Sequence, residues 1–131
     1  MYQILGYINV ALLVGITAPY WLKKLNQWLF HWKGKSYESA LKTLRKLHKP
    51  LGISLVLISI VHGYLALGAF RLHTGSLAWI MLLITASLGI AFYRLKKAQL
   101  FKWHKAFALI VTVFTAVHLL FPGLLSLLRV Q

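Results

Sequence analysis

Four long apolar stretches constrain the fold of this chain more than any other feature of its sequence. None contains Lys, Arg, Asp or Glu, and they are expected to run over Met1–Leu22, Leu51–Phe70, Ser76–Tyr93 and Ala106–Leu128. Each is long enough to cross a hydrocarbon layer of about 30 Å as a helix. Apolar residues make up 60% of the chain, more than in an ordinary soluble domain. The sequence therefore predicts an all-α integral membrane four-helix bundle, with residues 1–131 forming one domain.

The first apolar stretch is predicted to be a retained helix rather than a signal peptide. No basic residue precedes it, whereas Lys23 and Lys24 follow it, and it has no clear small-residue cleavage site. We therefore count it as the first of the four membrane-spanning helices.

The distribution of basic residues predicts the orientation of these helices. Thirteen of the fifteen basic residues lie in two regions, residues 23–49 and 94–105, and only Arg71 and Arg129 lie elsewhere. The positive-inside rule places both regions in the cytoplasm, so both chain termini are expected outside the cytoplasmic membrane. The second and fourth helices then run in the same direction. We attribute the net charge of +14 to topology and to attraction by anionic lipid, since no nucleic-acid-binding motif accompanies it.

Two pairs of histidines with equal spacing are the strongest functional signal. His48 and His62 are fourteen residues apart, and so are His104 and His118. Fourteen residues make nearly four helical turns, so both members of a pair face one side, about 21 Å apart along the axis. The flanking sequence repeats as well, because Lys-x-His-Lys surrounds each inner histidine and Val precedes each outer one. On parallel helices, this predicts two stacked sites with one histidine from either helix.

Paired imidazoles at two levels fit two haems better than they fit zinc. Zinc prefers about four ligands around one point, whereas these histidines form pairs about 21 Å apart. A lone histidine in a membrane helix can simply hydrogen-bond a neighbouring helix. Ionisable groups are costly inside a membrane, so two pairs with equal spacing favour a functional role over this structural one. The absence of cysteine excludes covalent haem attachment and thiolate-ligated iron–sulfur clusters. We expect His48 and His104 to bind an inner haem iron, and His62 and His118 an outer one.

Other residues near the histidines are candidate contacts for these haems. Four basic side chains are expected near the inner ligands, where they would attract haem propionates: Arg45, Lys49, Lys102 and Lys105. His73, in the outer loop, is a candidate contact for a propionate, a quinone or a substrate, or else a solvent-exposed loop residue. Gly75 and Gly89 are also fourteen residues apart, which either leaves space for macrocycle edges or allows close helix packing.

The region between the first two spans, residues 23–49, is predicted to be an interfacial basic segment. Trp28, Phe30 and Trp32 are the kind of aromatic residues that settle at the headgroup boundary. From Tyr37 onward, apolar residues recur at helical spacing, which predicts a short interfacial helix. Pro50 then suits the first turn of the next helix or a kink. The basic residues of this segment either lie on lipid or dock an acidic partner.

Several kinds of chemistry are excluded by what the sequence lacks. It contains no glycine-rich nucleotide motif and leaves no room for a flavin or nicotinamide domain. Glu38 is the only acidic residue, so the chain offers neither a carboxylate metal site nor a carboxylate relay for protons. Electrons are therefore expected to enter from a membrane quinone or an acidic cytoplasmic redox protein, and to leave to an outer-side acceptor that the sequence does not identify.

The chain resembles the dihaem b-type membrane cytochromes, and the resemblance rests on four residues: His48, His62, His104 and His118. These include cytochrome b of the quinol:cytochrome c oxidoreductases and the transmembrane domains of ferric reductases and NADPH oxidases. The chain also resembles small bacterial four-helix b-type cytochromes, some of which oxidise quinol or superoxide. The resemblance implies two low-spin haems b, held non-covalently, that form an electron path across the membrane. Unlike the ferric reductases, this chain has no flavoprotein domain and no additional helices.

The expected function is transmembrane electron transfer, with the chain acting as a relay subunit for a partner oxidoreductase. One alternative is a self-sufficient membrane oxidoreductase that uses quinone, ferric iron or superoxide at a haem edge. The other is a non-redox helical membrane scaffold. A reduced-minus-oxidised visible spectrum separates the scaffold from the two redox functions.

Overall fold

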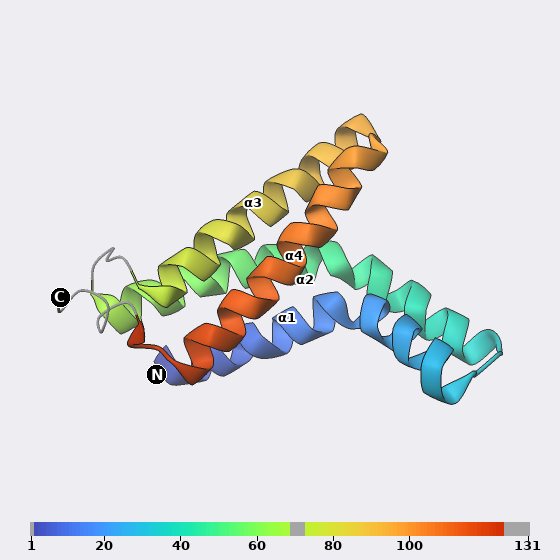
Figure 1. The fold of residues 1–131 in the computed structure, drawn as a ribbon, viewed down its shortest axis with the longest axis horizontal. Coiled ribbons are helices and arrows are strands. Elements are labelled where there is room, and N and C mark those ends of the chain that lie inside the picture. The colour runs from blue at the N-terminus through green and yellow to red at the C-terminus, as the bar shows by residue number, and fades with distance from the viewer. Residues whose placement is uncertain (1, 69–72, 125–131) are drawn as a thin grey trace. The chain divides into compact units, whose positions relative to one another are not determined.

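The computed structural model describes residues 2–68 and 73–124, which form four long helices with short connections (Figure 1). The helices are α1 (Tyr2–Leu25), α2 (Lys35–Leu67), α3 (Thr74–Leu95) and α4 (Ala98–Leu120). A π-helical turn, Asn26–Phe30, directly follows α1. The expected all-α fold with four helices is therefore confirmed for the described residues.

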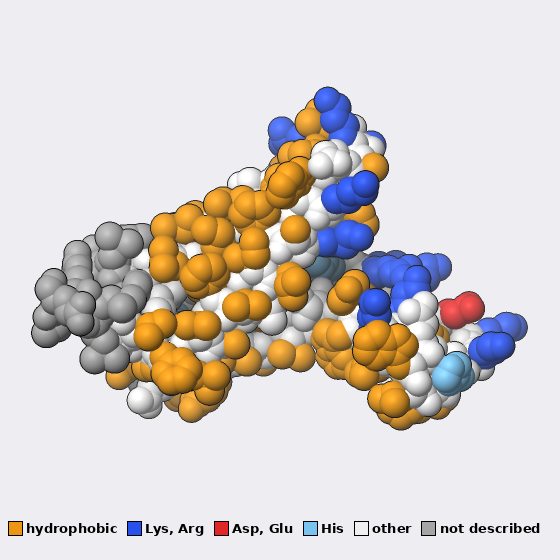
Figure 2. Space-filling view, in the orientation of Figure 1, with side chains coloured by type: hydrophobic (Ala, Val, Ile, Leu, Met, Phe, Trp, Pro, Cys, Tyr) orange, Lys and Arg blue, Asp and Glu red, His pale blue; other side chains and the backbone are white. Residues whose placement is uncertain are grey.

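All four helices are long and apolar enough to cross a membrane. Many large apolar side chains are exposed to the surroundings rather than packed inside, for example Tyr64 on α2, Ile90 on α3 and Leu109 on α4. Figure 2 shows apolar side chains over the visible surface of α3 and α4, with Lys and Arg side chains gathered where these two helices join. Water would oppose this arrangement, because exposed apolar surface is costly, whereas a bilayer favours it.

The helix bounds differ from the expected spans at the basic segments. The interfacial segment and the second span are one continuous helix, because α2 begins at Lys35 and passes through Pro50. A proline removes one backbone hydrogen bond, but the bonds of the neighbouring turns remain, so the helix continues. The fourth helix likewise begins at Ala98 rather than at Ala106. Residues 69–72 and 125–131, which include Arg71 and the predicted end of the fourth span, lie outside the described residues.

The chain forms two compact units. One comprises residues 3–58, which are α1, the π-helical turn and most of α2; the second comprises Tyr2, the end of α2 from Ser59, and helices α3 and α4. The core of the first unit includes Leu13 and Leu55, and that of the second includes Leu82 and Val111. The expected grouping of all residues into one domain stays a prediction.

Helices α3 and α4 form a tight antiparallel hairpin in the second unit. Lys96, with a left-handed φ of 55°, ends α3, and α4 begins two residues later. The Phe92 and Phe101 rings, whose centroids are 5.0 Å apart, pack together across this turn. At the other end of α3, the His73 ring accepts a hydrogen bond from the Gly75 backbone and so caps the helix. His73, expected in a loop, thus lies at the helix boundary.

Candidate haem-ligand site

Both histidine pairs lie on uninterrupted helices, as their spacing predicts. His48 and His62 belong to α2, and His104 and His118 belong to α4. The continuous helices place the two members of each pair on one side, about 21 Å apart along the axis. All four side chains are half-buried. Part of each imidazole is therefore accessible from outside the helices.

The two histidines of α2 bond to backbone carbonyls of α1 through the same ring nitrogen. His48 Nδ1 lies 3.1 Å from the Ile16 carbonyl oxygen, and His62 Nδ1 lies 2.8 Å from the Tyr2 carbonyl oxygen. Ile16 and Tyr2 are themselves fourteen residues apart, so their spacing matches that of the histidines. A carbonyl oxygen can only accept a hydrogen bond, so each Nδ1 carries the proton and donates.

The two histidines of α4 bond to α3 through Nδ1 as well. His104 Nδ1 donates to the Thr85 carbonyl oxygen at 2.8 Å. His118 Nδ1 lies 2.9 Å from the Thr74 hydroxyl oxygen, and that hydroxyl donates to the Pro122 carbonyl oxygen at 3.2 Å. A hydroxyl has only one proton, so the two bonds form together only when Thr74 accepts from His118 Nδ1–H and donates to the Pro122 carbonyl. Thr74 is buried, with 3% of its surface exposed, which keeps water from competing for this bond.

One tautomer is therefore selected at all four histidines. In a neutral imidazole that is protonated at Nδ1, the lone pair lies on Nε2, the nitrogen that would bind iron. Metal-binding histidines typically donate their other ring N–H to a carbonyl or a comparable oxygen, which fixes the ring and raises its basicity. The chain supplies this arrangement four times, with acceptors from α1 for α2 and from α3 for α4.

Gly75 and Gly89 give the α4 histidines the space that they occupy. A Cβ atom at Gly75 would lie 3.0 Å from His118 Cε1, and one at Gly89 would lie 3.1 Å from His104 Cε1. Carbon atoms in favourable contact are about 3.5–4.0 Å apart, so a larger residue would push against either ring. The equal spacing of glycines and histidines on two antiparallel helices thus places each glycine against one imidazole. The sequence predicts close packing or macrocycle contact here, and the structure shows contact with the imidazoles.

The outer histidine of α4 belongs to a small cluster of imidazoles. The ring centroids of His73 and His118 are 5.5 Å apart, with the rings nearly perpendicular. His62 also lies within the range at which its charge would affect His118. The structure therefore brings His62, His73 and His118 into one region of the second unit. His48 lies in the first unit and His104 in the second, so their pairing stays a prediction.

The basic residues that are expected near the inner ligands are exposed. Arg45 and Lys49 lie on the exposed side of α2 near His48, and Lys102 and Lys105 lie in the first turns of α4 near His104. The Lys105 ammonium lies over the Phe101 ring, 4.9 Å from its centroid. A contact of these side chains with haem propionates stays a prediction.

The hydrogen-bond acceptors of the four histidines could not be predicted from the sequence. The accepting residues Tyr2, Ile16, Thr74 and Thr85 contribute three carbonyls and one hydroxyl, and a backbone carbonyl has no sequence signature. Within the part of the chain that the structure describes, no three His, Asp or Glu side chains form a group able to hold a metal ion by themselves. No family model, curated protein or solved structure matches the chain.

Proposed function

We propose that this chain is a membrane cytochrome that holds two haems b and carries electrons from one side of the membrane to the other. His48 and His104 would hold one haem, and His62 and His118 the other. The observation that carries the proposal is that two equally spaced pairs of histidines on membrane-length helices all donate Nδ1–H to an oxygen of the preceding helix. A bound haem would supply reversible one-electron chemistry at its iron.

The protein's own contribution would be ligation, orientation and exclusion of water. The Nδ1 bonds hold each imidazole in one tautomer and limit its rotation, so little ordering would be needed when iron binds. The oxygen acceptors also make Nε2 more basic, which favours the more highly charged ferric state. The apolar helices would surround the path with a low-dielectric layer.

The proposed orientation places the basic ends of the helices in the cytoplasm. Thirteen of the fifteen basic residues flank the connection between α1 and α2 or that between α3 and α4, so both chain termini would lie outside. His48 and His104 lie nearer to these basic ends than His62 and His118 do. The haem held by His48 and His104 would therefore be the inner one.

A stripe of exposed basic residues favours an acidic cytoplasmic protein as the electron donor. It lies on α2 at positions i, i+3, i+4 and i+7 and consists of Lys42, Arg45, Lys46 and Lys49. This spacing puts all four on one helix face, close in sequence to His48. A positive face speeds the encounter with an acidic partner. A self-sufficient oxidoreductase that takes electrons from quinol is the second candidate function, and a non-redox scaffold is the third.

The test is the cofactor content and redox behaviour of the purified chain. Protein that is produced with an adequate haem supply should contain about two haems b per chain, extractable by acidic acetone, with six-coordinate low-spin spectra. Zinc without haem, or a chain without any reduced-minus-oxidised signal, would refute the proposal. Reduction by quinol alone, without any protein donor, would move the assignment to the self-sufficient oxidoreductase.

A further inference from the structure

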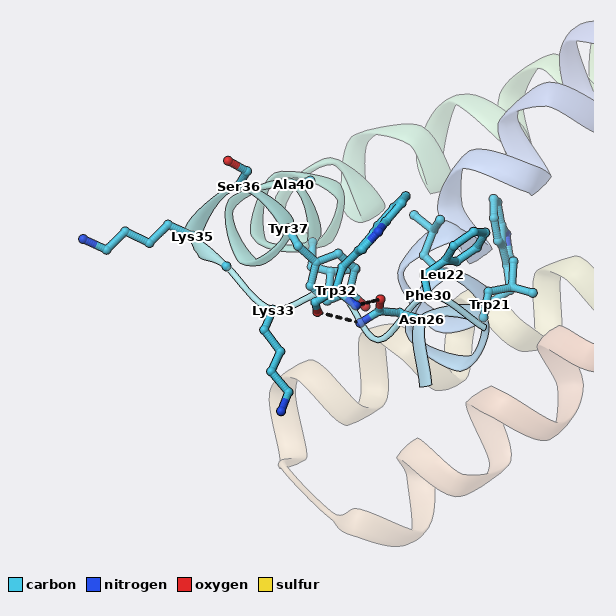
Figure 3. Close-up of a pocket in the computed structure, with 13 residues that line it drawn as sticks. Trp21, Leu22, Asn26, Phe30, Trp32, Lys33, Lys35, Ser36, Tyr37 and Ala40 are labelled. Atoms are coloured by element: carbon cyan, nitrogen blue, oxygen red, sulfur yellow. Dashed lines mark hydrogen bonds between the residues drawn. The ribbon is translucent and has the colours of Figure 1, made fainter. Parts of the chain in front are cut away.

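A pocket at the junction of α1 and α2 is separate from the proposed haem ligands. It has a volume of about 710 Å³ and lies within the first compact unit. Its wall is largely apolar and includes Trp21, Leu22, Phe30 and Trp32 from the α1 side and Leu41 from α2 (Figure 3). Sites for small molecules commonly have volumes of about 300–1,000 Å³ and similar apolar walls with a few polar groups. The pocket is thus large enough for part of a lipid.

The aromatic wall of this pocket is fixed by local bonds. The Asn26 side chain donates to the Trp32 carbonyl oxygen at 3.0 Å, and its own oxygen accepts from the Trp32 backbone N–H at 2.7 Å (Figure 3). His31 takes a left-handed φ of 50°, which turns the chain after the π-helical turn. The Phe30 and Trp32 rings then stack with their centroids 4.7 Å apart. These contacts form the wall before any ligand binds, which reduces the ordering cost of binding.

The polar groups of the pocket favour an anion. Lys33 and Lys35 line its mouth, and Figure 3 shows both side chains extending away from the cluster of rings. The first turn of α2 also begins here, and its leading N–H groups place the positive end of the helix dipole beside Ser36. None of the residues that line the pocket is acidic. Glu38 also lies in the first turn of α2 but does not line the pocket, so the charged side chains of the lining are two lysines at the mouth of an otherwise largely apolar wall.

One polar group of a residue that lines the pocket has no partner among the described residues. The Tyr37 hydroxyl is buried, and no described residue hydrogen-bonds to it, although Tyr37 lines the pocket. A buried hydroxyl without a partner is costly, so a ligand oxygen that accepts from it would remove this cost. The hydroxyl would be satisfied by an oxygen acceptor, and the two lysines by a negative charge. A matching ligand is therefore largely apolar and carries both at one end.

We propose that this pocket binds one anionic phospholipid. The phosphate would lie at the mouth near Lys33 and Lys35, the Tyr37 hydroxyl would donate to a phosphate or ester oxygen, and the upper acyl chain would cover Trp21 and Leu22. Free phosphate could bind near the two lysines as the headgroup does, but it would leave the apolar wall uncovered. The membrane character of α1 and α2 places such a lipid within reach. The proposal does not depend on the haems, so its failure and the failure of the proposed function are distinguishable.

Native mass spectrometry of the full chain in detergent measures this binding directly. We expect phosphatidylglycerol to bind far more tightly than phosphatidylcholine with the same acyl chains. Lys33→Gln together with Lys35→Gln should weaken phosphatidylglycerol binding about thirtyfold, if each lysine contributes as a basic residue does at an anionic membrane surface. The matched control is Lys96→Gln together with Lys97→Gln, which removes the same charge at the α3–α4 turn and should leave the tight site unchanged.

The Tyr37 hydroxyl provides a second test with a distinct readout. Tyr37→Phe should weaken phosphatidylglycerol binding at least about fivefold, the value of one hydrogen bond. The melting temperature of this variant in lipid-free detergent should not fall, because the lost hydroxyl has no hydrogen-bond partner within residues 2–68 and 73–124. Tyr64→Phe, at an exposed position on α2, is the control and should change neither quantity.

Four results would overturn the proposal. Equal binding of the two phospholipids would show that charge is not recognised. Equal losses in the pocket double variant and in the control double variant would show that net charge alone governs binding. Binding of glycerol 3-phosphate as tight as that of the lipid would assign the site to a soluble phosphate, and displacement of the lipid by a short-chain quinone at this site would assign it to a quinone.

Discussion

The contacts of the two α3 glycines lead to a prediction that separates the haems. In Gly75→Ala, the new methyl group would lie 3.0 Å from His118 Cε1, and in Gly89→Ala it would lie 3.1 Å from His104 Cε1. Without haem, the imidazole can turn away from the methyl group only by giving up its Nδ1 hydrogen bond. Iron ligation would hold the ring in place, so the steric cost should appear mainly in haem affinity. Gly75→Ala should therefore weaken the outer haem, and Gly89→Ala the inner one.

The expected size follows from two opposing terms. Placing an extra methyl group in a tightly packed contact costs about 2 kcal/mol. In the haem-free chain, the ring can turn away from the methyl group and lose its Nδ1 hydrogen bond instead, which costs about 1 kcal/mol. The helix propensity of alanine is the same in both states and cancels. The difference of about 1 kcal/mol corresponds to about fivefold weaker retention of the affected haem. Gly15→Ala is the control, since a Cβ there would lie 3.8 Å from Leu51 Cδ1, an ordinary van der Waals contact.

Haem retention in each variant can be followed by the visible spectrum during dialysis against apomyoglobin, and potentiometric titration identifies which component is lost. Gly15→Ala should retain both haems as well as the unmodified chain does. Depletion of the same component in Gly75→Ala and Gly89→Ala would contradict the assignment of one glycine to each haem. Equal loss of haem in the Gly15→Ala control would show that the contacts with the imidazoles are not the cause.

Three further predictions concern the ligands, their hydrogen bonds and the donor. His62→Ala and His118→Ala should each remove the outer component in a redox titration, whereas His48→Ala and His104→Ala should remove the inner one; loss of one component in both His48→Ala and His118→Ala would contradict this pairing. Thr74→Val should retain the outer haem but raise its midpoint potential, because His118 Nε2 becomes less basic when Nδ1 loses its acceptor. Thr112→Val, which removes a hydroxyl that donates to the Ala108 carbonyl of the same helix, should leave the potential unchanged. Stopped-flow reduction by an acidic protein donor should slow as salt rises, since charges are screened over about 8 Å at physiological ionic strength, and should slow further when Lys42, Arg45 and Lys46 become Gln. Reduction by quinol should respond much less, and rapid reduction by quinol alone would point away from a protein donor.

The helices themselves could be predicted from the sequence because their determinants are local. Apolar length identifies a membrane-crossing helix, and a spacing of fourteen residues fixes two side chains on one side of any continuous α-helix. The positions of His48, His62, His104 and His118 on two such helices follow from these rules alone. The helix ends were less predictable. Pro50 is typical of a boundary, yet α2 continues through it, because proline removes one backbone hydrogen bond while those of the neighbouring turns remain.

Only the tertiary structure shows what each histidine bonds to. The register of α1 against α2 decides that the carbonyls of Tyr2 and Ile16 meet the α2 histidines, and the sequence spacing within α2 carries no information on that register. The same holds for the hydroxyl of Thr74 and the carbonyl of Thr85 on α3. The sequence shows that Gly75 and Gly89 have the same spacing as the histidines, but only the structure shows which imidazole packs against each glycine. Periodicity along a helix is a property of one segment, whereas hydrogen-bond partners between helices depend on how two segments slide and rotate against each other.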